Sequence, residues 1–210
     1  MLKDVRPRTT QTDAQMTSQE VLREHSGLAR TRDFEQAGIA RWRLSRLVDA
    51  GVIERVCRGL YRATDLPMTT DIELVHACAA VPHGVIFLAS ALFHYGLTTY
   101  YPSSVWLAVG QKDRVTRPVA PPVQLHFLTA KYHQMGVNVV TLASGDIRIY
   151  DREKTLCDCL RFRNTVGLDI ALEALRNYLG MRGASRDKLM RYAKQCRVES
   201  MMRRYLEAIV

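Results

Sequence analysis

Arginines gather in one short part of the chain, residues 40–62. This stretch holds six arginines against two acidic residues, Asp49 and Glu54, a net charge of +4. Guanidinium groups bind phosphate oxygens, and the O6 and N7 acceptors of guanine, through paired hydrogen bonds. The residue types therefore indicate contact with nucleic acid, and the alternative is a basic face that is simply solvated.

Three helices are predicted around this stretch. A capping box at Thr17-Ser-Gln-Glu20 begins the first, which Gly27 ends. The second covers Thr31 to Ala37, and Gly38 then allows the left-handed backbone that ends a helix tightly. The third covers residues 40–50. Two short helices joined by a glycine-containing turn are typical of a helix-turn-helix.

The third helix has two distinct faces when its residues are placed about 100° apart. The apolar face, expected to point to the core, consists of Ala40, Leu44, Leu47 and Val48. The opposite face carries Trp42, Ser45, Arg46 and Asp49, with Arg41 and Arg43 flanking the apolar stripe. Such an outward face is suited to the major groove of DNA.

A β-hairpin is predicted directly after this helix, over residues 52–62, with its turn at Arg58-Gly59. A basic hairpin in this position is a wing, with Arg58 at its tip and Arg55 and Arg62 on its strands. We also include the start of the second helix among the candidate contacts. The full candidate DNA-binding set is Thr31, Arg32, Arg41, Trp42, Arg43, Ser45, Arg46, Arg55, Arg58 and Arg62.

The fold class expected for the whole chain is α/β (α+β). Residues 1–15 are predicted to be a disordered arm, residues 16–65 a winged helix-turn-helix domain, and residues 70–210 a mixed α/β domain that ends in a helical bundle. In the second domain we expect helices at 71–80 and 88–95, strands at 105–109, 123–128, 137–142 and 146–150, and helices at 152–163, 168–179, 185–195 and 199–208.

The overall composition agrees with a basic, non-membrane protein. The chain carries 30 Lys and Arg against 21 Asp and Glu, a net charge of +9, which favours an acidic partner or reflects a GC-rich genome. No run approaches the roughly 18 apolar residues of a membrane span. The five cysteines are odd in number and irregularly spaced, so we expect no disulfide framework and a cytoplasmic location.

Motifs for catalysis or metal binding are weak. Cys157 and Cys159 lie in a predicted helix with their sulfurs about 200° apart, which prevents them from sharing a metal. Ser90 lacks the Gly-x-Ser-x-Gly turn of a hydrolase nucleophile, and the chain has no glycine-rich phosphate loop. We therefore predict no metal and no cofactor.

One segment leaves an enzyme reading open. Asp151-Arg-Glu153-Lys154 follows a predicted strand and has a partial likeness to metal-dependent nucleases. Those sites need an acid two residues before the lysine, where this chain has Arg152. The alternative is a helix N-terminus, where the helix dipole favours acidic residues in the first turn.

The chain as a whole resembles the AbiEi antitoxins of bacterial type IV toxin–antitoxin systems. The resemblance lies in the runs 44–61 (LSRLVDAGVIERVCRGLY), 90–97 (SALFHYGL), 150–158 (YDREKTLCD) and 168–179 (LDIALEALRNYL), so it covers nearly everything after the first fifteen residues. It implies that the first domain binds inverted repeats in its own promoter and represses the operon. It also implies that the second domain counteracts a nucleotidyltransferase-like toxin.

The leading hypothesis is therefore a DNA-binding antitoxin and autorepressor that acts by stoichiometric binding, without catalysis. An alternative is a stand-alone winged-helix regulator whose second domain senses a ligand or dimerises, and another is a winged-helix-guided nuclease. The sequence predicts no oligomeric state.

Overall fold

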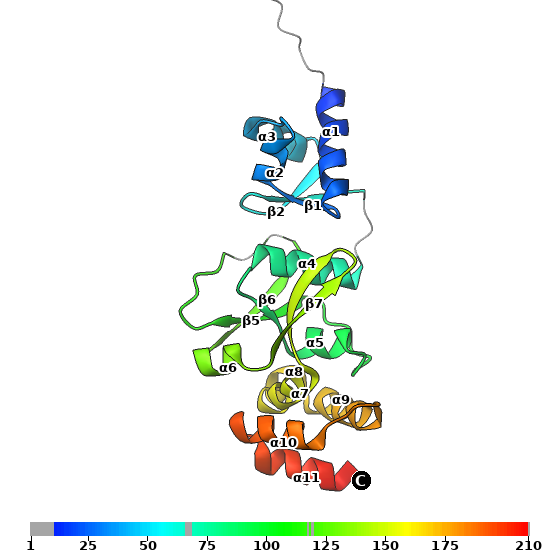
Figure 1. The fold of residues 1–210 in the computed structure, drawn as a ribbon, viewed down its shortest axis with the longest axis vertical. Coiled ribbons are helices and arrows are strands. Elements are labelled where there is room, and N and C mark those ends of the chain that lie inside the picture. The colour runs from blue at the N-terminus through cyan, green and yellow to red at the C-terminus, as the bar shows by residue number, and fades with distance from the viewer. Residues whose placement is uncertain (1–10, 66–68, 117, 119, 210) are drawn as a thin grey trace, which may run out of the picture. The chain divides into compact units, whose positions relative to one another are not determined.

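The computed structural model describes residues 11–65, 69–116, 118 and 120–209. The chain divides into two compact units, residues 1–69 (unit 1) and 70–210 (unit 2), which are described separately (Figure 1). Residues 1–10 of the predicted arm lie outside the described residues, as do residues 66–68 between the two predicted domains.

Unit 1 is a three-helix domain with a small sheet. Its elements are α1 (Gln11–Glu24), β1 (Leu28–Arg30), α2 (Thr31–Gln36), α3 (Arg41–Asp49), β2 (Ile53–Cys57) and β3 (Leu60–Ala63). The strands pair antiparallel in the order β1-β3-β2. Gly38, at φ +80°, allows the tight turn between α2 and α3. The predicted helix-turn-helix followed by a β-hairpin wing is confirmed.

The core of unit 1 fixes the rotation of α3. Leu44 is fully buried and Leu47 is 3% exposed, and both pack in one cluster with Leu22 and Phe34. The ring of Phe34 meets that of Tyr61 edge-on, with 5.8 Å between centroids. Since one stripe of α3 is buried here, its opposite stripe faces solvent.

Unit 1 differs from the sequence-based expectation in two places. Helix α1 begins at Gln11 rather than near Thr17, since the residues from Gln11 to Met16 include no glycine or proline that would stop it. Strand β1 was not expected, because three residues are too few for a β-periodicity. It is defined by pairing with β3, in which Arg30 lies opposite Leu60.

Unit 2 is a mixed α/β domain, as expected. Its elements are α4 (Thr70–Ala80), β4 (Val85–Ile86), α5 (Leu88–His94), β5 (Val105–Gly110), β6 (Val123–Leu128), α6 (Ala130–Gln134), β7 (Val137–Leu142), β8 (Gly145–Tyr150), α7 (Arg152–Arg161), α8 (Arg163–Val166), α9 (Leu168–Gly180), α10 (Arg186–Gln195) and α11 (Glu199–Ile209). The sheet order is β6-β5-β4-β8-β7. Strands β5 and β6 are parallel, as are β4 and β8, and the other two pairs are antiparallel.

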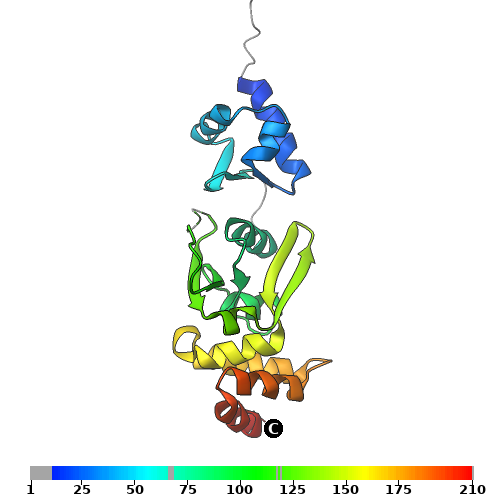
Figure 2. The same ribbon diagram turned by 60° about the vertical axis from the view of Figure 1, so that its left-hand side comes forward.

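The sheet is the middle layer of unit 2. Along β5, Leu107 and Val109 belong to the core cluster that includes α4, whereas Trp106 and Ala108 belong to the cluster formed with α5, α7, α9 and α10. Figure 2 shows α4 on one side of the sheet and the C-terminal helices gathered on the other. Because both faces of β5 are covered, its sequence is apolar throughout rather than alternating.

Three short elements of unit 2 were not predicted. One is α8, four residues that follow α7 where a single helix was expected to end at residue 163. Strand β4 has two residues, yet it is hydrogen-bonded to both β5 and β8 and is fully buried. Its apolar residues continue directly into α5, so the sequence contains no boundary between strand and helix. Helix α6 has five residues, which is too short for a recognisable helical periodicity.

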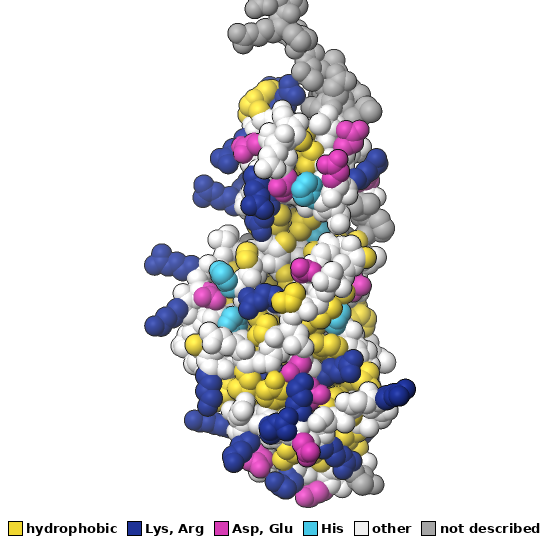
Figure 3. Space-filling model, viewed as in Figure 1, with side chains coloured by type: hydrophobic (Ala, Val, Ile, Leu, Met, Phe, Trp, Pro, Cys, Tyr) yellow, Lys and Arg dark blue, Asp and Glu magenta, His cyan; other side chains and the backbone are white. Residues whose placement is uncertain are grey.

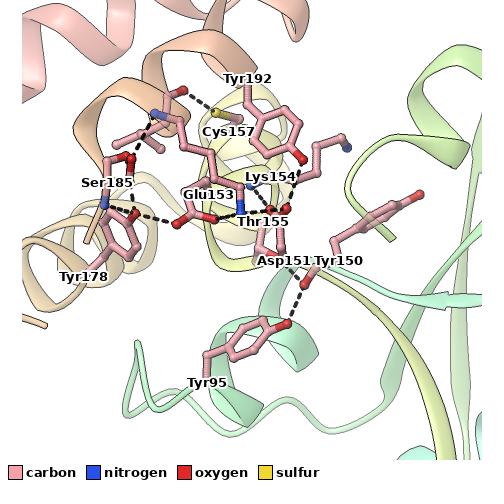
Figure 4. Close-up of polar contacts among 12 residues, drawn as sticks. Tyr95, Tyr150, Asp151, Glu153, Lys154, Thr155, Cys157, Tyr178, Ser185 and Tyr192 are labelled. Atoms are coloured by element: carbon pink, nitrogen blue, oxygen red, sulfur yellow. Dashed lines mark hydrogen bonds and ion pairs between the residues drawn. The ribbon is translucent and has the colours of Figure 1, made fainter. Parts of the chain in front are cut away.

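The predicted helix N-terminus at Asp151 is confirmed, and it anchors the C-terminal helices (Figure 4). One oxygen of Asp151 caps α7 by accepting from the Lys154 amide at 2.8 Å, and the other accepts from the Tyr192 hydroxyl at 2.9 Å. Lys188 contacts Asp151 at 3.2 Å and Glu153 at 2.8 Å. This network ties α10 to the start of α7.

Glu153 joins the same network from the first turn of α7. It accepts from the Tyr178 hydroxyl on α9 at 2.6 Å as well as from Lys188. Burial disfavours the Glu153 carboxylate, but these hydrogen bonds outweigh burial and lower its pKa. The acidic residues that left the nuclease reading open are thus bonded to protein donors from α9 and α10.

A buried ion pair joins Lys154 to Asp158 one turn later in α7, with 0% and 1% of the side chains exposed. The Lys154 ammonium also lies 4.3 Å from the ring centroid of Tyr150. Burial raises the pKa of the Asp158 carboxyl to about 6, because desolvation outweighs the attraction of Lys154. Each charge is tolerated inside the domain because the other is present.

We expect Asp158→Asn to lower the free energy of unfolding of unit 2 by about 3–5 kcal/mol, since it leaves Lys154 charged and buried without a counter-ion. The double variant Lys154→Met/Asp158→Asn removes both charges and should lose far less. Urea unfolding can be followed by Trp106 fluorescence in a Trp42→Phe background, because the chain has only two tryptophans. A loss below about 1 kcal/mol in the single variant would contradict burial of the pair.

Candidate nucleic-acid interface

The outward face of α3 presents an aromatic residue between two arginines. The Trp42 side chain is 58% exposed, and the guanidinium carbons of Arg43 and Arg46 each lie 5.3 Å from its ring centroid. Ser45 and Arg46 are exposed, and Arg43 is half-buried. These distances are those of cation–π contacts, so the indole and the two guanidinium groups form one cluster, called here the Trp42 cluster (Trp42, Arg43 and Arg46).

The wing carries exposed arginines at its tip and on β2. Arg58 and Gly59 form the turn between β2 and β3, and Gly59 has φ +77°, which glycine adopts without strain. The Arg55 side chain is exposed, and its Nε donates to the Cys57 carbonyl at 3.3 Å. The hairpin thus projects positive charge beyond the sheet.

An open hollow of about 490 Å³ lies between the wing and the starts of α2 and α3 (called here the arginine hollow). Its lining holds five arginines and one acidic residue: Arg30, Arg32, Arg41, Arg55 and Arg58, with Thr31, Glu35, Gly59 and Tyr61. Figure 3 shows basic side chains along the flank of unit 1 that carries α3 and β2 in Figure 1. A concave surface with this excess of guanidinium groups is suited to a phosphate backbone.

Two arginines of the hollow, whose own side chains are 75% and 76% exposed, make ion pairs within unit 1. Arg41 lies 3.7 Å from Glu35, and Arg32 lies 3.4 Å from Asp33. Exposed pairs of this kind contribute little and are screened by salt. Both arginines can therefore exchange these partners for phosphate at small cost.

Two predicted contact residues are mostly buried and hold the wing in place. The Arg62 side chain is 17% exposed and is paired with Glu54 on the neighbouring strand. Thr31 is 9% exposed, and its amide donates to the Gly59 carbonyl at 3.0 Å. A Cβ at Gly59 would meet the Thr31 hydroxyl at 3.3 Å, so these residues secure α2 to the wing turn.

Sequence reasoning missed Arg30, which lines the hollow beside Arg32. It lies in β1, whose existence depends on pairing with β3. The available signal was its place immediately before Thr31, where the second helix was predicted to begin. The remaining predicted residues divide into the hollow (Arg32, Arg41, Arg55 and Arg58) and the outward face of α3 (Trp42, Arg43, Ser45 and Arg46).

Within the described ranges, no group of three or more His, Cys, Asp or Glu side chains is arranged to hold a metal ion. None of the described helices is long and apolar enough to cross a membrane.

Comparison with solved structures shows a shared fold. The crystal structure of the RV2827C protein from Mycobacterium tuberculosis matches with a TM-score of 0.59 and 13% sequence identity, over 96% of this chain and 83% of that one. No curated protein sequence matches the chain.

A family match covers the interface itself. Residues 16–64, which include α2, α3 and the wing, match the family described as transcriptional regulator, AbiEi antitoxin. Over α2, α3 and the wing, unit 1 is therefore similar to the transcriptional regulators and antitoxins of the AbiEi family.

Proposed function

We propose that this protein is an antitoxin and autorepressor that binds inverted repeats in its own promoter through unit 1. One observation supports the DNA-binding part of this proposal: the Trp42 cluster lies next to the arginine hollow. Arg41 lines the hollow, and Trp42, the next residue of α3, belongs to the cluster. The N-terminal turn of α3 would enter the major groove, as recognition helices do.

The two groups of side chains would bind different parts of the DNA. Arg43 and Arg46 on α3 would read base edges, because the groove offers the paired acceptors of guanine. Arg41, Arg55 and Arg58 would bind phosphates, which fix the register of the protein on DNA but carry no sequence information. Arg62 and Thr31 stay outside this proposed contact set because they serve the wing internally.

The antitoxin part of the proposal rests on the description of the matching family and on the size of unit 2. Unit 2 would counteract a nucleotidyltransferase-like toxin encoded beside this gene. Asp151 and Glu153 at the start of α7 are bonded to donors within the unit, which favours stoichiometric binding over catalysis at those two residues.

We expect Arg43→Ala/Arg46→Ala to abolish the specific mobility shift of the full chain on its own upstream DNA, at about 150 mM salt with excess competitor. Each arginine that reads a guanine contributes about 1–3 kcal/mol of discrimination. The matched control is Arg203→Ala/Arg204→Ala, which removes two exposed arginines from α11 and should leave the shift intact. An unchanged shift in the α3 variant would remove both residues from the base-reading set.

Arg58→Ala should weaken binding equally on specific and non-specific duplexes. Since each phosphate contact releases counter-ions, the slope of log K against log salt should fall by about one. Arg62→Gln on the same wing is the control, because its charge is used by Glu54, and its slope should match that of the unaltered protein. A loss confined to the specific duplex would instead assign Arg58 to base reading.

Neutralisation should not require DNA binding. Expressed from an independent promoter, both the unaltered chain and Arg43→Ala/Arg46→Ala should relieve growth arrest caused by the product of the neighbouring reading frame. Growth is measured in liquid culture with matched protein levels. Operator binding without any relief would favour the alternative, a stand-alone regulator whose unit 2 senses a ligand or dimerises.

A further inference from the structure

Trp42 is the one large apolar side chain that the described part of unit 1 leaves exposed. Its 58% exposure contrasts with Phe34, which is fully buried in the same domain. Burial of an indole stabilises a protein because it removes a large apolar surface from water, and an exposed indole does not contribute this free energy. The position therefore indicates a surface that is covered when a partner is bound.

The location of Trp42 specifies which part of a DNA partner would cover it. It is the second residue of α3, and N-terminal residues of a recognition helix contact base edges. Leu44 and Leu47 are buried on the opposite side, so the core fixes the direction in which the indole points. Arg43 and Arg46, each 5.3 Å from the ring centroid, hold the indole within the same cluster.

The chemistry of the major groove offers this cluster one apolar target. The exposed base edges there carry hydrogen-bond donors and acceptors, and the C5 methyl of thymine is the apolar group among them. Guanidinium groups pair with the O6 and N7 atoms of guanine, and an indole side chain can pack on a methyl. Apolar wedges that unstack bases act mainly from the minor groove, which does not admit a recognition helix.

We propose that Trp42 is a specificity-determining residue that packs on the C5 methyl of a thymine beside a guanine read by Arg43 or Arg46. The operator is thereby predicted to hold thymine and guanine as neighbours where α3 docks. This inference rests on the proposed DNA binding by unit 1, and it adds the base that an exposed indole would recognise.

The test compares one duplex with and without thymine methyls. The upstream DNA of this gene is amplified with dTTP or with dUTP, which removes every C5 methyl while base pairing and phosphates stay the same. The full chain should bind the dUTP duplex about fourfold more weakly for each methyl contacted, which corresponds to the burial of one methyl group of about 0.8 kcal/mol.

Variants then assign the effect to Trp42. The ratio of the two dissociation constants should fall to about one for Trp42→Ala and stay close to the original for Trp42→Phe, which keeps an apolar ring. Tyr101→Ala is the matched control, since it removes an aromatic side chain that is 52% exposed in unit 2. Because each ratio compares one protein on two duplexes, a change in protein stability does not move it.

The outcomes separate this inference from the proposed function. A specific shift with equal affinity for the two duplexes overturns the reading of thymine and leaves operator binding standing. A Trp42→Ala variant that binds both duplexes more weakly but keeps the original ratio places the indole on the sugar–phosphate backbone instead. The lack of any specific shift by the unaltered protein overturns the proposed function, and this inference with it.

Discussion

Burial of one stripe of α3 is the constraint on which the candidate nucleic-acid interface depends. Leu44 and Leu47 pack with Phe34 and Leu22, and a helix that buries one face must show the other to water. The same packing therefore secures the fold of unit 1 and aims the Trp42 cluster outward. A change that loosened this core would disturb both the stability of unit 1 and the direction in which the Trp42 cluster points.

The two units differ in how their basic side chains are paired with acidic ones. In unit 1, five arginines line one open hollow whose acidic lining residue is Glu35, so the hollow carries an excess of positive charge. In unit 2, Lys154 and Lys188 are matched to carboxylates inside or at the edge of the core. The first arrangement favours binding an acidic partner, whereas the second stabilises a junction between helices. Asp151 and Glu153, whose residue types left a catalytic reading open, accept hydrogen bonds from side chains of α9 and α10.

The wing shows how similar residues acquire different roles from their partners. Arg55, Arg58 and Arg62 occur within eight residues of one hairpin. Arg58 is at the turn and exposed, whereas Arg62 is turned against Glu54, and Thr31 holds the turn against α2. A hairpin fixed at its base in this way presents its tip in a defined position, which lowers the entropy lost on binding.

The amino-acid sequence by itself determined the elements with a clear period or cap: α2, α3 and the wing, the strands β5 to β8, and the helix that begins after Asp151. Each carries a local signal: residues repeated at helical or strand spacing, a capped backbone amide or, in β5, an unbroken apolar run of strand length. Tertiary structure alone decided β1 and β4, the inward direction of Arg62 and the place of Arg30 in the hollow. Strands of two or three residues have no period of their own, and they exist because distant residues pair with them, as Ile149 does with Ile86. Whether an arginine faces a carboxylate or solvent likewise depends on a neighbouring strand, which no local pattern reveals.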